Sequence, residues 1–81
     1  MENMISYKNL WKKLIDIEMT KTEFQKKIKI STSTLAKLSR DEYVSMDVLV
    51  RICAFFNCQL SDICEVIYDK EVQKNLKKMI Y

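Results

Sequence analysis

The stretch that decides the fold is MTKTEFQKKIKISTSTLAKLSRDE, residues 19–42. Apolar residues recur at helical spacing in each of its two halves. Thr20 and Glu23 have the spacing of a capping box, in which each residue satisfies a free backbone N–H of the other. Ser31 or Thr32 can cap the second half in a similar way. The stretch therefore predicts two short helices joined by a tight turn. The apolar positions that would hold them at a steep crossing are Met19, Phe24, Ile28, Ile30, Leu35 and Leu38.

Cap signals and apolar periodicity predict three more helices outside this stretch. The first is capped by Ser6 and runs to about Glu18. Another is capped by Ser45, and Asn57 suits the left-handed position at its end because the chain has no Gly. A further helix is expected to start at Ser61. The apolar positions of these helices are Leu10, Trp11, Leu14 and Ile15, then Val48, Leu49, Ile52, Cys53 and Phe56, and finally Ile63, Cys64 and Ile67.

The last segment, residues 69–81, is a basic amphipathic tail. Val72, Leu76 and Met79 or Ile80 lie at helical spacing among four lysines. This pattern favours a sixth helix, packed on the domain or on a second subunit, over a frayed tail.

The fold class predicted for the chain is all-α. A compact five-helix domain is expected over residues 1–68, followed by the tail or extra helix over residues 69–81. The 81 residues suit one domain with one modest core. Because Gly and Pro are both absent, a strand-and-turn architecture would lack its usual turn residues.

Charge is distributed unevenly along the chain. Residues 1–42 carry a net charge of +3, residues 43–69 a net charge of −3, and residues 70–81 a net charge of +3. Within residues 21–40 there are six basic residues and a single acidic one. A local basic surface beside an acidic remainder is typical of a phosphate-binding face, and a solvated, lysine-rich helix face has the same pattern.

Several classes of function find little support in the composition. The chain has no His and no Gly-rich loop, so we expect neither an enzyme nor a protein with a cofactor or a small-molecule ligand. The spacings of Cys53, Cys58 and Cys64 match no zinc pattern, so no metal site is expected. We interpret the cysteines as reduced thiols of a cytoplasmic protein, with Cys53 and Cys64 acting as small core hydrophobes. No apolar run approaches the length that spans a membrane.

Residues 19–42, within a five-helix plan over residues 5–67, resemble the helix-turn-helix of the phage repressor/Cro (XRE-class) family. The stretch VLVRICAFFNCQLSDICEVI, residues 48–67, is also similar to the closing helices of small stand-alone members. The resemblance implies a transcriptional regulator, a repressor, whose partner is double-stranded DNA. It also implies that the helix beginning near Thr32 lies in the major groove with its N-terminal residues toward the base edges.

Matching by position to that family assigns three residues to base edges and three to phosphates. Lysine can donate to guanine O6 and N7, and hydroxyl side chains can donate or accept, so the residue types fit base contacts. A helix start with free N–H groups favours an anion, which fits phosphate. The expected base contacts are Thr32, Ser33 and Lys37, and the expected phosphate contacts are Thr20, Lys21 and Arg40.

Two residues depart from the family pattern. Lys29 stands at the turn position that family members usually fill with Gly. If it is left-handed, the strain is on the order of 1 kcal/mol. Gln25 stands where a small Ala is usual, and a larger polar side chain there is expected to push the two helices apart or to alter the turn.

A lone domain of this size makes few base contacts, so we expect a homodimer on a palindromic operator. The two recognition helices would then lie about 34 Å apart. The alternative is a protein-interaction module, antitoxin-like or an adaptor, that keeps the fold without DNA binding. Binding of RNA or single-stranded DNA has less support, because Phe24, Phe55 and Phe56 fall on inward or semi-inward positions. Trp11 is assigned to the core for a similar reason.

Overall fold

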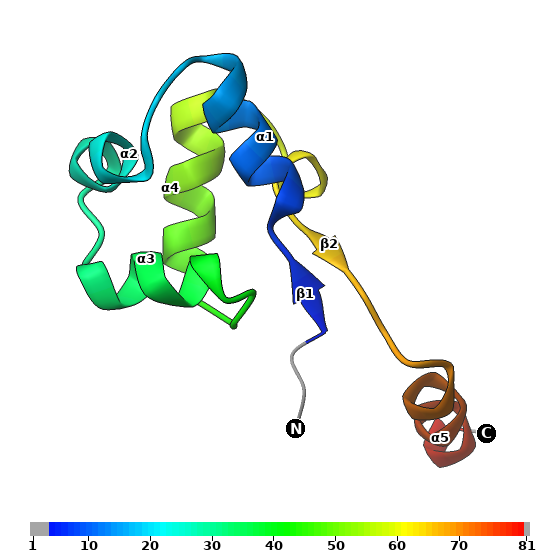
Figure 1. Ribbon diagram of the computed structural model, residues 1–81. Helices are drawn as coiled ribbons and strands as arrows, with labels where there is room; N and C mark the ends of the chain where they lie inside the picture. The colour runs from blue at the N-terminus through cyan, green and yellow to red at the C-terminus, as the bar shows by residue number, and fades with distance from the viewer. Residues whose placement is uncertain (1–3, 81) are drawn as a thin grey trace.

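The computed structural model describes residues 4–80 (Figure 1). In this part of the chain five α-helices account for most residues, as the all-α prediction requires. Helix α4 runs through the middle of the domain, with α1 on one side, α2 on the other and α3 crossing the view at its lower end (Figure 1). The helices are α1 (Lys8–Asp16), α2 (Lys21–Ile28), α3 (Thr32–Ser39), α4 (Met46–Phe56) and α5 (Lys70–Ile80).

Three of the predicted helix boundaries are confirmed by side-chain and backbone geometry. Ser31, not Thr32, is the N-cap of α3, and its Oγ accepts a hydrogen bond from the backbone N–H of Thr34 at 3.0 Å. Ser45 caps α4 through the N–H of Val48 at 3.3 Å. Asn57 ends α4 in the left-handed conformation, with φ 52° and ψ 55°.

The start of α1 differs from the prediction. Ser6 is not the N-cap, because it lies in a short strand and the N-cap residue is Tyr7, without a side-chain cap hydrogen bond. Ser6 Oγ still accepts a hydrogen bond from the N–H of Lys8 at 3.3 Å. The helix ends at Asp16, two residues before Glu18, which has the left-handed φ of 55°.

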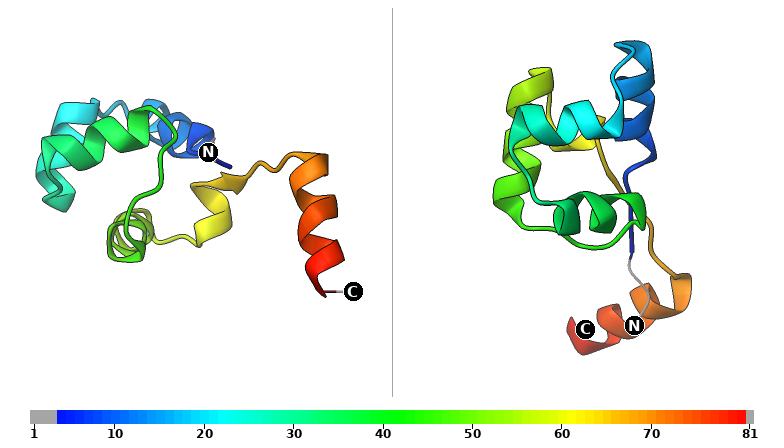
Figure 2. Two further views of the ribbon diagram at one scale, coloured as in Figure 1. Left: turned by 90° about the horizontal axis from the view of Figure 1, so that it is seen from below. Right: turned by 60° about the vertical axis from the view of Figure 1, so that its left-hand side comes forward.

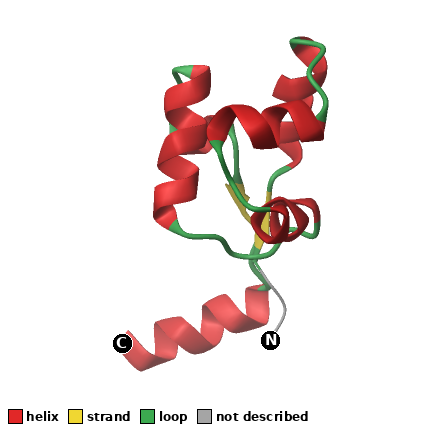
Figure 3. Cartoon of the chain, turned by 90° about the vertical axis from the view of Figure 1, so that its left-hand side faces the viewer, coloured by secondary structure: helices red, strands yellow, loops and turns green. Residues whose placement is uncertain are grey.

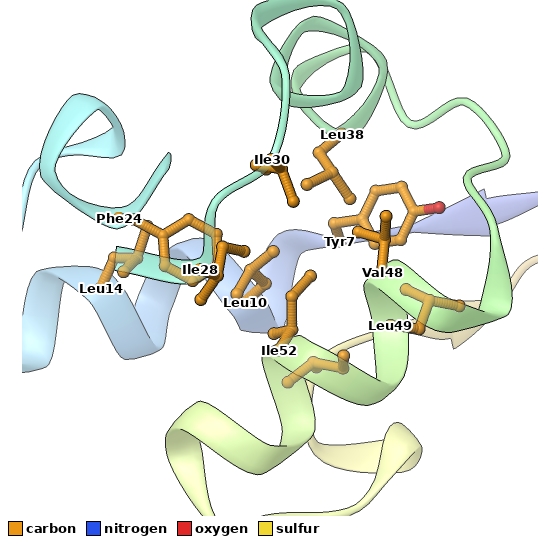
Figure 4. Packing of buried hydrophobic residues seen from close by; sticks show 11 residues of the cluster. Tyr7, Leu10, Leu14, Phe24, Ile28, Ile30, Leu38, Val48, Leu49 and Ile52 are labelled. Carbon is orange, nitrogen blue, oxygen red and sulfur yellow. The ribbon is translucent and has the colours of Figure 1, made fainter. Parts of the chain in front are cut away.

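The core lies between α1, α2, α3 and α4, and Figure 4 shows its side chains pointing toward one another. Each helix of the domain contributes at helical spacing, for example Leu10 and Leu14 from α1 or Phe24 and Ile28 from α2. Trp11 and Cys53 are partly buried and pack against this cluster, as predicted. The buried core residues are Tyr7, Leu10, Leu14, Phe24, Ile28, Ile30, Leu38, Val48, Leu49, Ile52 and Ile63.

The prediction of a helix starting at Ser61 is wrong. Residues Leu60–Asp62 form one turn of 3-10 helix (η1), closed by a hydrogen bond from the N–H of Gln59 to Asp62 Oδ2 at 2.9 Å. The chain then becomes extended, and β2 (Glu65–Val66) pairs antiparallel with β1 (Ile5–Ser6).

The physical reason is that this segment pairs with the start of the chain instead of continuing as a helix. In the extended segment Ile63 is fully buried, whereas Ile67 is 55% exposed. The β-branched residues Val66 and Ile67 favour an extended backbone. The N–H of Ile67 donates to the carbonyl of Met4 at 2.9 Å, which extends the pairing of the two strands.

The tail forms a helix, as the pattern of residues 69–81 favoured. Helix α5 extends away from the domain beyond β2, and the longest dimension of the molecule is 45 Å (Figures 1 and 3). The prediction also placed Met79 or Ile80 on the apolar face of this helix, but their side chains lie outside the described residues. Among the helices that the structure describes, none combines the length and the apolar character needed to cross a membrane.

Candidate nucleic-acid interface

The start of α2 is fixed by the predicted capping box. The N–H of Glu23 donates to Thr20 Oγ1 at 3.1 Å, and the N–H of Thr20 donates to Glu23 Oε1 at 3.1 Å. The hydrogen bond from the Thr20 backbone holds the pKa of the Glu23 carboxyl below its usual value. Thr20 and Lys21 are both exposed at this helix start, as the phosphate assignment requires.

The turn between α2 and α3 is formed without glycine. Lys29 adopts the left-handed conformation, with φ 55° and ψ 52°, so this non-glycine residue carries the strain expected of it. The next residue, Ile30, is buried and packs in the hydrophobic core, which fixes the position of the turn. The turn therefore has the geometry that a helix-turn-helix needs.

The turn is also held by a residue that sequence reasoning missed. Arg51, on α4, donates from Nη1 to the carbonyl oxygens of Ile28 at 3.4 Å and Lys29 at 3.1 Å. Its Nη2 forms an ion pair with Asp47 Oδ2 at 2.7 Å, one helical turn earlier on α4. The guanidinium thus satisfies two carbonyl groups at the end of α2, where a helix leaves such groups without partners. The sequence indicates the ion pair through the i, i+4 spacing of Asp47 and Arg51, but it does not indicate the contact of Arg51 with the end of α2.

Gln25 connects α2 and α3. Its Nε2 donates to Thr32 Oγ1 at 3.2 Å, so the side chain joins the middle of α2 to the first residue of α3. The longer polar side chain, at the position where family members favour Ala, is thus accommodated by a hydrogen bond between the two helices. Thr32 is thereby positioned at the start of α3.

The outer face of α3 is polar and exposed. Thr32, Ser33 and Lys37 all lie on it, and the last two are four residues apart, one turn of the helix. The opposite face is apolar, with Leu38 fully buried and Leu35 half-buried. The structure thus brings the three predicted base-contacting residues to one surface.

Lys21 lies between three helices. Its Nζ is 4.1 Å from the centre of the Trp11 ring on α1, a cation–π contact, and 3.3 Å from Ser39 Oγ near the end of α3. These contacts hold the ammonium group of Lys21 near the end of α3, although the side chain remains exposed. The ring of Trp11 is half-buried beneath it, which leaves this indole face covered and not open for stacking a base.

Arg40 follows α3 as its C-cap residue. Its Nε forms an ion pair with Glu42, and this hydrogen bond holds the pKa of the Glu42 carboxyl below its usual value. Lys37 contributes to the same electrostatic effect, so both cationic groups lie near Glu42. The ion pair uses one of the five N–H donors of the guanidinium, and the remaining donors suit a phosphate.

Comparisons with known proteins identify this arrangement. Residues 9–69 match the family model described as the Cro/C1-type HTH DNA-binding domain. The chain belongs to this family. A solved structure of the transcriptional regulator VanUg superimposes with a TM-score of 0.78 and 41% sequence identity, over 85% of this chain and 93% of that one. A comparison with curated proteins finds no match.

The family identity confirms the resemblance to phage repressor/Cro-type regulators and the expectation that the protein is not an enzyme. The thiols agree with that expectation, since burial raises the pKa values of Cys53 and Cys64 above their usual value. All three cysteines are free, and among the described residues no cluster of His, Cys, Asp or Glu could hold a metal ion.

A second residue that sequence reasoning missed positions the end of the recognition unit in this Cro/C1-type domain. The Oη of the fully buried Tyr7 donates to the carbonyl of Glu42 at 2.8 Å, and its backbone N–H donates to Asp41 Oδ1 at 3.0 Å. These bonds fix the loop that follows α3, next to Arg40. A signal was present, because Tyr7 precedes Leu10 and Leu14 at helical spacing and extends their apolar stripe by one turn.

Proposed function

We propose that this protein is a sequence-specific regulator of transcription that binds duplex DNA through α3, as a homodimer on a palindromic operator. The observation that carries the proposal is the exposed polar face of α3, flanked by Lys21 before it and Arg40 after it, in a domain of a DNA-binding family. The structurally similar VanUg is described as a transcriptional regulator, which supports the same role here.

Base recognition is assigned to Thr32, Ser33 and Lys37. Ser33 and Lys37 lie on one face of α3 one turn apart, so a single major groove can receive both side chains. Thr32 accepts a hydrogen bond from Gln25, which leaves its hydroxyl proton and methyl group for the DNA. A hydroxyl and an ammonium make fewer directional base contacts than Arg, Asn or Gln, so DNA shape would contribute to the specificity.

Phosphate binding is assigned to Thr20, Lys21 and Arg40. The first two residues stand at the start of α2, where free N–H groups and the helix dipole favour an anion. Arg40 would bind a second phosphate beyond the end of α3 with the donors that its ion pair with Glu42 does not use. These contacts would supply most of the affinity and fix the register of α3 in the groove.

We further propose that the protein acts as a repressor in the cytoplasm. Occupation of an operator by such a domain is by itself enough to exclude other proteins from that DNA, so repression requires no further activity. Two half-sites, with the recognition helices about 34 Å apart, would raise the number of base contacts above what one small domain offers.

The function is tested by selecting bound sequences from random duplex DNA with the purified protein and measuring affinity against salt. We expect an enriched palindrome, with log K falling linearly against log salt by about 0.9 per phosphate neutralised. Removal of charge by Lys21→Ala, Lys37→Ala or Arg40→Ala should weaken binding at least tenfold without unfolding the chain. Lys12→Ala, at an exposed lysine of α1, is the matched control and should bind like the wild type.

The absence of any enriched sequence, together with the absence of duplex binding at low salt, would contradict the proposal. That outcome would favour the alternative of a protein-interaction module with the same fold. Such a module would also tolerate all three charge-removing substitutions.

A further inference from the structure

Two free thiols lie at the end of α4. Cys53 is in the last turn of this helix, Asn57 ends it, and Cys58 follows directly. Both side chains are half-buried and pack against the hydrophobic core, as does the third free thiol, Cys64. The proposed contacts with DNA involve none of the three cysteines. Their chemistry is therefore a question separate from DNA binding.

The backbone at the end of α4 brings Cys53 and Cys58 together. The N–H of Cys58 donates to the carbonyl of Cys53 at 3.0 Å, and the N–H of Asn57 donates to the carbonyl of Ala54 at 3.3 Å. With Asn57 left-handed, these two bonds make a Schellman motif. In this motif the side chains of the two residues that the longer-range bond joins commonly contact one another. In this chain both of those side chains are thiols.

The same hydrogen bond limits the distance between the two residues. Added to the covalent dimensions of each residue, a donor–acceptor distance of 3.0 Å keeps the Cα atoms of Cys53 and Cys58 within about 7 Å of each other. Disulfide bonds join residues whose Cα atoms are about 4.4–6.8 Å apart. A disulfide between Cys53 and Cys58 is therefore compatible with the backbone of the folded protein.

The two thiols also influence each other. Burial raises the pKa of Cys53, and the neighbouring Cys58 thiol raises it further through its charge and a hydrogen bond. Cys64 has a smaller effect on the pKa of Cys53. Its own Sγ donates to the carbonyl of Leu60 at 3.4 Å, within its own turn. Cys58, and not Cys64, is thus the thiol partner of Cys53.

We propose that Cys53 and Cys58 are a redox-sensitive pair, which a hydroperoxide oxidises to a disulfide within one chain and which low-molecular-weight thiols reduce again. With hydrogen peroxide, a thiolate sulfur attacks one oxygen, the O–O bond breaks, and a sulfenic acid and hydroxide form. The second thiol attacks the sulfenic sulfur, the S–O bond breaks, and the hydroxyl leaves with the thiol proton as water. The two thiols are oxidised, and one peroxide is reduced to two molecules of water.

The first step is assigned to Cys58 and the second to Cys53. The thiolate is the reactive form of a cysteine, and burial keeps the Cys53 thiol protonated by raising its pKa. Cys53 then acts on a sulfenic acid that the Schellman motif holds next to it. Disulfides of cytoplasmic proteins are usually transient and redox-sensing, which agrees with a pair that is reduced in this structure.

The pair lies away from the recognition helix. Helix α4 begins beside α3 and ends at the far side of the domain, next to α1 (Figure 1). A disulfide at this end joins residues that already contact each other and requires no movement of α3. The proposal therefore stands or falls independently of DNA binding.

The first test treats the folded, reduced chain with hydrogen peroxide and then alkylates the remaining thiols. Cleavage before aspartate gives a fragment of residues 47–61 with both Cys53 and Cys58, and it separates Cys64 because Asp62 lies between. Mass spectrometry should find the first fragment unalkylated and lighter by two hydrogens, with Cys64 alkylated. Dithiothreitol should restore both thiols. Cys64→Ser is the matched control and should form the same disulfide.

Trapping of the sulfenic acid with dimedone tests the order of the steps. Cys53→Ser leaves the sulfenic acid of Cys58 without a partner, so dimedone should label Cys58 strongly in this variant and weakly in the wild type. Cys58→Ser should react more slowly with peroxide than Cys53→Ser, because its remaining thiol of the pair is held protonated. Circular dichroism establishes that each variant is folded, and an alanine variant replaces any serine variant that is not.

Several results would overturn the proposal. They are a disulfide that includes Cys64, cross-linked dimers as the main product, and thiols of Cys53 and Cys58 that stay reduced while Cys64 is oxidised. A fall in the midpoint of thermal unfolding after oxidation would also overturn it. A pair that is already in place should raise this midpoint, because the disulfide restricts the unfolded chain without straining the folded one.

Discussion

At the scale of single residues, the recognition unit depends on side chains that reach it from other parts of the chain. Arg51 bonds two carbonyl groups at the end of α2 from α4, and Tyr7 bonds the loop after α3 from the segment before α1. Neither side chain belongs to the predicted interface. A substitution of Arg51 or Tyr7 should therefore change the stability of the fold and the position of the helix-turn-helix without removing a side chain that contacts DNA.

Removal of the Arg51 guanidinium should loosen the turn. Arg51→Met keeps the aliphatic stem but leaves the carbonyl groups of Ile28 and Lys29 without this donor, and we expect a loss of about 1 kcal/mol in the free energy of unfolding. Urea denaturation measures the change. Arg51→Lys keeps the charge but has a single ammonium group in place of the guanidinium fork. Its free energy of unfolding should lie between those of the wild type and Arg51→Met. Equal stability of all three proteins would show that the contacts with α2 contribute nothing.

Tyr7 should make stability depend on alkaline pH. Burial raises the pKa of Tyr7 from 10.0 to about 12, so the folded protein favours the neutral phenol. Its contribution is fully present below pH 10 and is lost as the pH rises from about 10 toward 12. Tyr7→Phe should lower stability at pH 7 by about 1 kcal/mol, because the Glu42 carbonyl loses its donor. Between pH 8 and 12 the free energy of unfolding of Tyr7→Phe should fall less steeply with pH than that of the wild type. Parallel curves for the two proteins would contradict a role of the Tyr7 phenol.

At the scale of elements, the sequence is sufficient to predict helix ends at which a side chain bonds a backbone group within one turn of the same helix. The Thr20–Glu23 capping box, the Ser31 and Ser45 caps and the left-handed Asn57 all involve such neighbours. The segment after Ser61 was wrongly predicted because its conformation depends on pairing with Ile5 and Ser6, some sixty residues earlier. Pattern alone does not distinguish a short helix from a short apolar strand.

The same distinction applies to the candidate interface. The exposure of Thr32, Ser33 and Lys37 on one face followed from helical periodicity, and the structure agrees with that placement. The contacts of Gln25 with Thr32 and of Lys21 with Trp11 did not follow from it, because each joins side chains on different helices. The sequence thus predicts which residues form the exposed surface of α3. It does not predict the contacts through which other helices position those residues.

Relief of the strained turn should stabilise the helix-turn-helix. Lys29 is left-handed, and glycine adopts this conformation without the steric cost of a Cβ. Lys29→Gly should therefore raise the free energy of unfolding by about 0.5–1 kcal/mol in thermal or urea denaturation. Lys27→Gly, in the last turn of α2, is the matched control and should destabilise by up to about 1 kcal/mol, because Gly has a low helix propensity. Destabilisation by both substitutions would show that the turn is not strained.

At the scale of the whole molecule, the domain separates two surfaces. The α2–turn–α3 unit lies at one end of the molecule, and α5 lies at the other (Figure 2). The homodimer of the proposed function would present two recognition helices together, so affinity for DNA would depend on protein concentration as well as on salt. The charge segregation along the chain is consistent with this division, because the basic segments flank an acidic one.

The dependence of DNA binding on salt should report the number of phosphate contacts in the dimer. Lys21→Ala removes one cationic contact in each subunit, so the slope of log K against log salt should decrease in magnitude by about 1.8. Fluorescence anisotropy with a labelled operator measures the slope. Lys12→Ala should leave it unchanged. An unchanged slope for Lys21→Ala would remove Lys21 from the phosphate contacts.

Base recognition by α3 is tested most directly by selection from random duplex DNA with the wild type and with Lys37→Gln in parallel. Lysine donates to guanine, whereas glutamine pairs with adenine through N6 and N7. We expect the same palindrome from both proteins except at one base pair in each half-site, where the preference changes from guanine toward adenine. An identical palindrome from the two proteins would contradict a base contact by Lys37, and no palindrome from either would contradict base recognition by α3 altogether.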